Sequence, residues 1–172
     1  MLYLIGVQHG LQYVGIGSAE YEHISRFKKY LSTQCKKIKP KYIAEEFNDD
    51  ALKKRCATSN ITTCKEISEK FNIQHIFIEP TLEERKVLNI PTNKEIHEKL
   101  GIKLNFFNQK EAELISHEEN KYFPIREKFW LSKIPKKDSG LVIIGASHIE
   151  TFKSLLESQK IPFSILDSKW DI

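Results

Sequence analysis

Cysteine is scarce in this sequence of 172 residues, and its three cysteines form no Cys-x-x-Cys pair. Cys35, Cys56 and Cys64 are an odd number at irregular spacing. Such a pattern supports neither a disulfide framework nor a zinc site built on cysteine. We therefore expect three reduced thiols.

Long apolar runs are also missing. No stretch of the sequence approaches the roughly 20 apolar residues that span a bilayer. The N-terminus lacks the basic segment and long apolar run of a signal peptide, because only a short apolar run follows Met1. We expect no contact with a membrane and, as the default, a cytoplasmic location.

Charge of one sign does not dominate, since the net charge is only +4. A composition of 40% hydrophobic and 29% charged residues is ordinary for a globular protein. Lysines concentrate between Lys28 and Lys41, where they could attract the phosphates of a nucleic acid. No aromatic stacking pattern accompanies these lysines, so a role in nucleic-acid binding is kept as an alternative.

What the sequence does contain is a series of short apolar runs separated by amphipathic segments. Five runs predict buried strands: Leu2 to Ile5, Tyr42 to Ala44, Ile76 to Ile78, Leu141 to Ile144 and Phe163 to Leu166. Apolar residues at helical spacing predict helices over 19–38 and 61–71. We expect the terminal DSKWDI to be a loose end.

The interval from Thr81 to Ile134 contains no convincing strand and is interrupted by Pro91, Gly101 and Pro124. We expect a helical insertion at about 81–134. The whole pattern predicts one α/β domain over residues 1–172, with a mostly parallel central sheet of about five strands flanked by helices. A chain of this length is long enough to bury one core.

Two predicted strands end in the same Gly-x-x-His pattern. GVQH, from Gly6 to His9, follows the first strand, and GASH, from Gly145 to His148, follows the fourth. Ligands of an open parallel sheet bind outside the carboxyl ends of its strands. We therefore expect His9 and His148 at one site, although each could instead bond only to the backbone of its own turn.

The residues after the fourth strand also carry a signal for the start of a helix. Ser147 and Glu150 have the spacing of a capping box, which predicts Ser147 as the N-cap and His148 as the first helical residue. The positive helix end would lower the pKa of the imidazole and keep it neutral. A neutral imidazole is what a general base or a metal ligand requires.

Acidic residues follow the second and third predicted strands. Glu45 and Glu46 end the second strand, and because strand side chains alternate, only one should enter the crevice; we favour Glu45. Glu79 ends the third strand and could alternatively cap the next helix, for which Thr81 and Glu84 have capping-box spacing. Two histidines and these carboxylates could hold a divalent ion or pair a base with an orienting acid.

One arginine precedes an aromatic anchor. Arg126 stands shortly before Phe129 and Trp130, where it could be held toward a carboxylate or an anionic intermediate. The alternative is a surface arginine paired with Glu119 or Glu127. The residues expected to contact substrate are Gln8, Glu79, Arg85 and Ser147.

These motifs, taken in order, resemble the TraB/Tiki-like superfamily, which includes erythromycin-esterase-like and ChaN-like proteins. The motifs are GVQH, the strand-end AEE (Ala44 to Glu46), REKFWLSKI (Arg126 to Ile134) and GASH, and the resemblance extends from Gly6 to about Leu166. It implies that His9 and His148 are site histidines, Glu45 or Glu46 their acidic partner and Arg126 an anion-stabilising group. Members include metal-dependent proteases, metal-free esterases and haem- or iron-associated proteins, so the resemblance does not select one reaction.

We predict a hydrolase acting on a small-molecule or peptide substrate. In one version a divalent ion (Mn, Co or Zn), held by His9, His148 and Glu45, lowers the pKa of bound water. In the other a neutral histidine beside a carboxylate acts as general base. The alternatives are a non-catalytic protein that binds a small ligand or haem, and a nucleic-acid-associated protein that uses Lys28 to Lys41.

His23, His97 and His117 are expected to be solvated.

Overall fold

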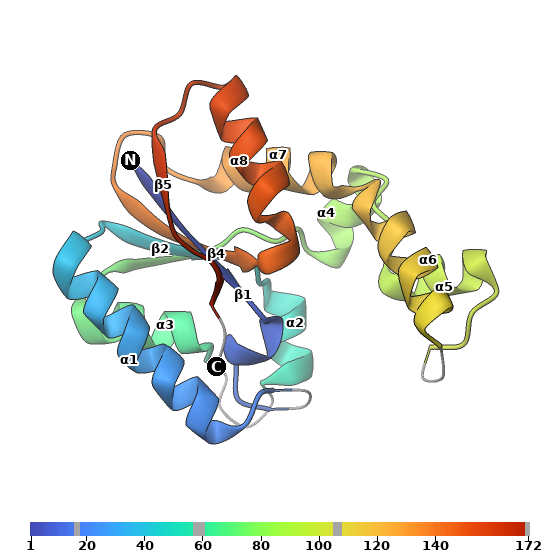
Figure 1. The fold of residues 1–172 in the computed structure, drawn as a ribbon, viewed down its shortest axis with the longest axis horizontal. Helices are drawn as coiled ribbons and strands as arrows, with labels where there is room; N and C mark the ends of the chain where they lie inside the picture. Colours follow the sequence, from blue (N-terminus) through green and yellow to red (C-terminus); the bar gives the residue numbers. More distant parts are fainter. Residues whose placement is uncertain (16–17, 57–60, 105–107, 171–172) are drawn as a thin grey trace.

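The computed structural model describes residues 1–15, 18–56, 61–104 and 108–170. Its centre is one sheet of five parallel strands in the order β3-β2-β4-β1-β5. The strands are β1 (Leu2–Val7), β2 (Tyr42–Glu45), β3 (Gln74–Phe77), β4 (Gly140–Gly145) and β5 (Phe163–Trp170). The prediction of an α/β fold with a parallel sheet of about five strands is confirmed (Figure 1).

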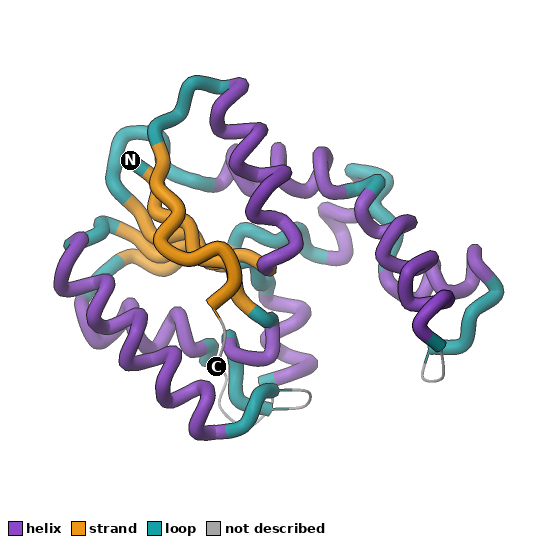
Figure 2. Tube along the Cα trace, in the orientation of Figure 1, coloured by secondary structure: helices purple, strands orange, loops and turns teal. Residues whose placement is uncertain are grey.

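Helices cover both faces of the sheet. One face is covered by α1 (Tyr21–Ile38) and α3 (Thr63–Phe71), and the other by α7 (Phe123–Lys133) and α8 (Ile149–Ser158), as Figures 1 and 2 show. Alternation of side chains along each strand supplies both layers: Ile43 packs toward α1 and α3, whereas its neighbours Tyr42 and Ala44 pack toward α7 and α8. A parallel sheet buried on both faces explains why the strands read as continuous apolar runs.

The connections that follow the neighbouring parallel strands β1 and β4 lead in opposite directions across the sheet. The connections after β1 and β2 move toward β3, with α1 and α3 on one face, whereas α8 leads from β4 to β5 across the other face. The connections after β1 and β4 therefore diverge at the carboxyl edge of the sheet. A crevice at such a switch point is the place where open α/β sheets bind ligands.

The predicted insertion is helical. It consists of α4 (Leu82–Val87), α5 (Asn93–Leu100), α6 (Gln109–Asn120) and α7, and α5 and α6 lie away from the sheet around a small core of Ile96, Ile102 and Ile115 (Figure 1). The expectation that His97 is solvated is wrong. It is only 3% exposed, and its Nδ1 lies 3.3 Å from the carbonyl oxygen of Ile102, which follows the same helix.

Several local details complete the fold. The short helices α2 (Asp49–Arg55), η1 (His9–Leu11) and η2 (Ala146–His148) follow β2, β1 and β4 respectively. The predicted loose end is wrong as far as Trp170, because β5 continues to that residue, whose ring packs on Phe27 and Tyr30; residues 171–172 lie outside the described part. Within the described ranges, no helix is both long and apolar enough to cross a membrane.

Candidate active site

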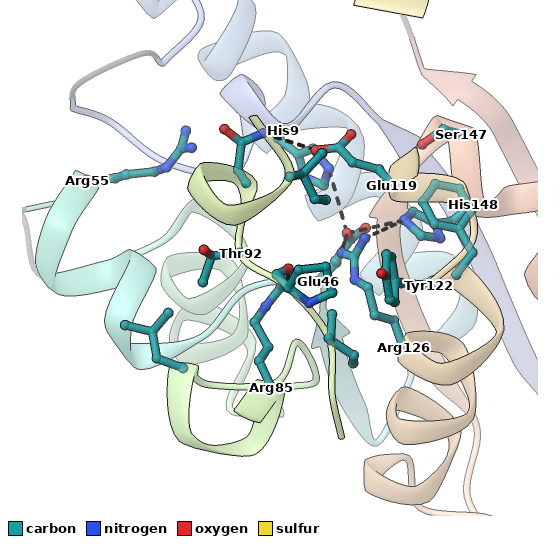
Figure 3. Close-up of a pocket in the computed structure, with 16 residues that line it drawn as sticks. His9, Glu46, Arg55, Arg85, Thr92, Glu119, Tyr122, Arg126, Ser147 and His148 are labelled. Atoms are coloured by element: carbon teal, nitrogen blue, oxygen red, sulfur yellow. Dashed lines mark hydrogen bonds and ion pairs between the residues drawn. The ribbon is translucent and has the colours of Figure 1, made fainter. Parts of the chain in front are cut away.

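A cavity of about 510 Å³ opens at the carboxyl edge of the sheet. His9 comes from the end of β1, Glu46 from the end of β2 and His148 from the end of β4, while Arg126 enters from α7 and Arg85 from α4 (Figure 3). The parallel register brings these strand ends together, since Glu45 of β2 is level with Ile143 of β4. Chain segments far apart in sequence thus line one polar cavity.

Glu46 lies at the centre of this arrangement and is only 4% exposed. Its Oε1 is 2.5 Å from Nη2 of Arg126, and its Oε2 accepts a 2.7 Å hydrogen bond from the backbone N–H of Gly145. Burial opposes ionisation of Glu46, but the charge of Arg126, the N–H of Gly145 and, when their rings are protonated, the charges of His9 and His148 outweigh it and lower the pKa of Glu46 to about 2. Glu46 is therefore a carboxylate at neutral pH.

Arg126 joins the carboxylates that follow β2 and β3. Its Nη2 also lies 3.0 Å from Oε2 of Glu79, and the same oxygen accepts a 2.9 Å hydrogen bond from Nε1 of Trp130. Burial disfavours the charged guanidinium, but Glu46 and Glu79 overcome this and raise the pKa of Arg126 above its usual range. The alternative of a surface arginine paired with Glu119 or Glu127 is wrong, because α7 turns Arg126 toward the sheet edge.

His148 is buried, with a side chain only 2% exposed. Its Nδ1 lies 2.9 Å from Oε1 of Glu127 and its Nε2 lies 3.2 Å from Nη1 of Arg126. The ring packs between Phe123, at a centroid distance of 3.6 Å, and Trp130, at 4.6 Å. Because the guanidinium can only donate to Nε2, His148 carries its proton on Nδ1 and donates it to Glu127.

His9 differs from His148 because its side chain is 51% exposed. Its Nδ1 lies 2.8 Å from Oε1 of Gln12, and its Nε2 faces the cavity 3.7 Å from Oε1 of Glu46. Nε2 of His148 is 3.6 Å from the same oxygen. The two imidazoles therefore lie against the same carboxylate oxygen of Glu46 (Figure 3).

The motif glycines are explained by close packing. A Cβ on Gly145 would lie 2.8 Å from Nε2 of His9 and 3.2 Å from Oε2 of Glu46. A Cβ on Gly6 would lie 2.2 Å from the backbone oxygen of Ser168 in β5. A larger residue at position 145 would thus displace His9, whereas one at position 6 would push against the neighbouring strand.

The preference for Glu45 over Glu46 is wrong. Glu45 follows Ile43 on the face covered by α1 and α3, where it is fully buried and bonds to Thr62 and His75. Glu46 emerges with Ala44 on the face of α7, which supplies Arg126. The alternation of strand side chains was expected, but the face on which the cavity opens depends on where α7 packs.

The predicted substrate-contacting residues have different positions. Arg85 and Ser147 line the cavity, and Glu79 lies behind it, bonded to Arg85 and Arg126. Gln8 is exposed and does not line the cavity, because it only precedes the turn η1. The capping box at Thr81 is confirmed.

The capping box predicted at Ser147 is wrong. The residues from Ala146 to His148 form the 3-10 turn η2, and α8 begins at Ile149 without a side-chain cap. His148 is therefore the residue that precedes α8. Its orientation depends on Glu127 and on the rings of α7 rather than on a cap.

The side chains present do not fit the predicted divalent ion. Glu45 lies on the other face of the sheet, and both oxygens of Glu46 are engaged by Arg126 and Gly145. The Arg126 guanidinium bridges Nε2 of His148 and Oε1 of Glu46, so that its charge occupies the place between these two ligands. Among the described residues, no group of three or more His, Cys, Asp or Glu side chains is arranged to hold a metal.

Three side chains at the site were not predicted from the sequence. Glu127 binds His148, Gln12 binds His9, and Arg55 lines the cavity with Nη1 2.5 Å from the hydroxyl of Tyr13. Glu127 left a signal, because it lies four residues after Phe123 and three before Trp130 on the buried face of α7. Gln12 and Arg55 stand in segments whose positions depend on tertiary packing.

Comparison of this chain with family models, with curated proteins and with solved structures found no match. The resemblance to the TraB/Tiki-like superfamily therefore stays a prediction from short motifs. We therefore infer function from the geometry of the cavity.

Proposed function

We propose that this protein is a hydrolase that cleaves an ester or amide bond of a small-molecule or peptide substrate, with His9 as the base that activates water. The observation that carries this proposal is the half-exposed imidazole of His9, whose Nε2 faces the cavity beside the ionised Glu46. The wall of the cavity also contains arginines that suit a reaction in which negative charge develops. Since the residues do not fit a resident metal ion, the metal-free version is preferred.

In the proposed reaction, Nε2 of His9 takes a proton from water while the water oxygen forms a bond to the carbonyl carbon of the substrate. The Glu46 carboxylate, 3.7 Å away, is placed to stabilise the imidazolium that forms. When the tetrahedral intermediate collapses, the bond to the leaving group breaks and His9 returns the proton to that group. The products are an acid and an alcohol or amine.

Arg126 is suited to stabilise the oxyanion of the intermediate. Four of its five N–H groups donate to Glu46, to Glu79 twice and to His148. One N–H of Nη1 therefore has no bonding partner within the described part of the chain. A donor held in place by the carboxylates of Glu46 and Glu79 needs no reorganisation as charge develops, which favours the transition state over the substrate.

His148 has a supporting part in this proposal. Both of its ring nitrogens are engaged and its ring is buried, so that it holds Arg126 and Glu46 in place rather than contacting the substrate. This division of roles departs from the expectation that the two histidines act alike.

The proposal is tested with purified protein and a panel of small esters and short peptides. His9→Ala should reduce hydrolysis by about 10²-fold or more, which is the usual contribution of a general base. His23→Ala is the matched control, because His23 is a partly exposed histidine on α1 outside the cavity. Hydrolysis that survives His9→Ala would contradict the proposal.

The same assay separates the alternatives. Activity that is lost on chelation and restored by Mn, Co or Zn would favour the metal-dependent version. A stoichiometric Soret band without hydrolysis would favour haem binding.

We keep a cytoplasmic location as part of the proposal.

Nucleic-acid binding remains the second candidate because lysines line the surface between α1 and α3. Lys28, Lys29, Lys36 and Lys70 border one hollow there, in which Lys28 pairs with Glu66 at 2.5 Å. The segment ends at Lys41, immediately before β2, and thus at the amino edge of the sheet, opposite to the cavity. Binding of DNA or RNA that weakens steeply with salt would support this candidate.

A further inference from the structure

A buried polar cluster lies on the face of the sheet opposite to Glu46 and is used by none of the steps above. At its centre is Glu45, which is fully buried. Thr62 donates its hydroxyl proton to Oε1 of Glu45, and Nε2 of His75 lies 2.6 Å from the same oxygen. Nε2 of Gln12 lies 3.5 Å from the other oxygen, Oε2.

The direction of the hydrogen bonds in this cluster follows from the carboxylate, which can only accept. The hydroxyl of Thr62 accepts the N–H of Lys65 at 3.1 Å, which leaves its own proton for Glu45. Burial, followed by the charge and the hydrogen bond of Glu45, raises the pKa of the Cys64 thiol well above its usual value, so that the thiol stays protonated and donates. The groups that surround Glu45 therefore present donors to it.

Gln12 connects this cluster to the cavity, because its side chain contacts both Glu45 and His9. Its side chain is fully buried, and its amide has one donating end and one accepting end. With Nε2 toward Glu45, Oε1 points at Nδ1 of His9, 2.8 Å away. The reversed amide would set its oxygen against the carboxylate of Glu45, and a buried pair of acceptors is costly.

The backbone holds Gln12 in this position. Its carbonyl oxygen accepts a 2.7 Å hydrogen bond from the N–H of Thr63, and the next residue, Tyr13, forms a β-bridge with Thr62. The turn that carries His9 is thereby tied to the start of α3, where Thr62 is both the N-cap and a donor to Glu45.

We infer that Gln12 and Glu45 are positioning residues that hold the proton of neutral His9 on Nδ1 and thereby leave Nε2 free to accept a proton in the cavity. A carbonyl oxygen accepts but cannot donate, so Oε1 of Gln12 requires a proton on Nδ1, and neutral imidazole carries only one. The inference rests on the proposed role of His9 as base, and it gives the adjacent glutamates separate tasks. Glu46 faces the reacting side of the imidazole, and Glu45 acts on its far side through Gln12.

The test reads the tautomer directly from the ¹⁵N chemical shifts of His9 in the full-length protein labelled at histidine, recorded at a pH where His9 is neutral. The wild-type protein should show protonated Nδ1 and unprotonated Nε2. Gln12→Met and Glu45→Gln should both lose this preference, because the first removes the acceptor and the second lets the Gln12 amide reverse. Gln74→Met, which changes an exposed glutamine at the start of β3, should leave the tautomer unchanged.

The hydrolysis assay supplies a second readout. Both variants should lower kcat by about 2- to 5-fold with little change in KM, because a smaller fraction of His9 is in the competent tautomer.

The possible results separate the two proposals. A proton on Nε2 in the wild-type protein overturns the inference, as does a tautomer unchanged in folded Gln12→Met, and the wild-type measurement decides even where a variant fails to fold. The expected ¹⁵N pattern in a protein without hydrolytic activity would overturn the proposed function while the assignment of Gln12 and Glu45 stands.

Discussion

His9 and His148 follow the same Gly-x-x-His pattern at neighbouring strand ends, yet the fold gives them different surroundings. His148 is enclosed by Phe123 and Trp130, with both ring nitrogens bonded. His9 is half exposed, and one nitrogen faces the cavity. A repeated motif thus places two side chains at one edge, but the elements packed over that edge decide which imidazole is exposed to the cavity.

The largest expected effect comes from replacing Arg126, which contacts His148 and also Glu46, the carboxylate that lies near both histidines. Arg126→Leu would remove the cation that buried Glu46 shares with partly buried Glu79, and we expect a loss of about 3 to 5 kcal/mol in the free energy of unfolding, measured by denaturant titration. Lys94→Met removes one member of an exposed pair with Glu98 and should change stability little. Similar stability of the two variants would show that Arg126 does not organise the site.

The pH dependence of the free energy of unfolding tests the ionisation of Glu46. Its pKa in the folded protein is about 2, below the ordinary value of 4.5, so its ionisation stabilises the fold above pH 4.5 and this contribution is lost as the pH falls toward 2. While His9 and His148 are protonated, the contribution is on the order of 3 kcal/mol. The stability difference between wild type and Glu46→Gln should therefore shrink as the pH falls from 4.5 toward 2, whereas a difference independent of pH would argue against an ionised Glu46.

Replacing each histidine in turn compares them directly. His148→Ala should reduce stability by about 2 to 3 kcal/mol, because it leaves a space between two rings and removes the donor from buried Glu127. His9→Ala should cost about 1 kcal/mol or less while removing hydrolysis. Thermal unfolding together with the ester assay measures both effects, and equal losses of stability would contradict the division of roles.

The last comparison is between the two motif glycines, Gly6 and Gly145. Gly6→Ala should cost about 2 to 3 kcal/mol, because its Cβ meets the backbone oxygen of Ser168 at 2.2 Å. Gly145→Ala should cost about 1 kcal/mol, since the half-exposed His9 ring can move aside, but hydrolysis should fall. Unchanged activity in Gly145→Ala would mean that the position of His9 does not matter.

The strands of the central sheet and the helices beside them were predictable because their signals are local. Apolar runs such as Leu141 to Ile144 and the periodicity over 61–71 depend on side chains close in sequence, and the structure has β4 and α3 at those places. The shared edge of His9 and His148 was predictable for a related reason, because parallel strands end at one side of a sheet.

The sequence by itself determined that an α/β sheet forms and that two histidines, two adjacent glutamates and Glu79 follow its strands. Only the tertiary structure decided that Glu46 and not Glu45 faces the cavity, because α7 covers that face and brings Arg126 to it. It also decided that His148 is enclosed, whereas His9 bonds to Gln12 and lines the cavity. These choices depend on contacts between segments far apart in the chain, which no local pattern encodes.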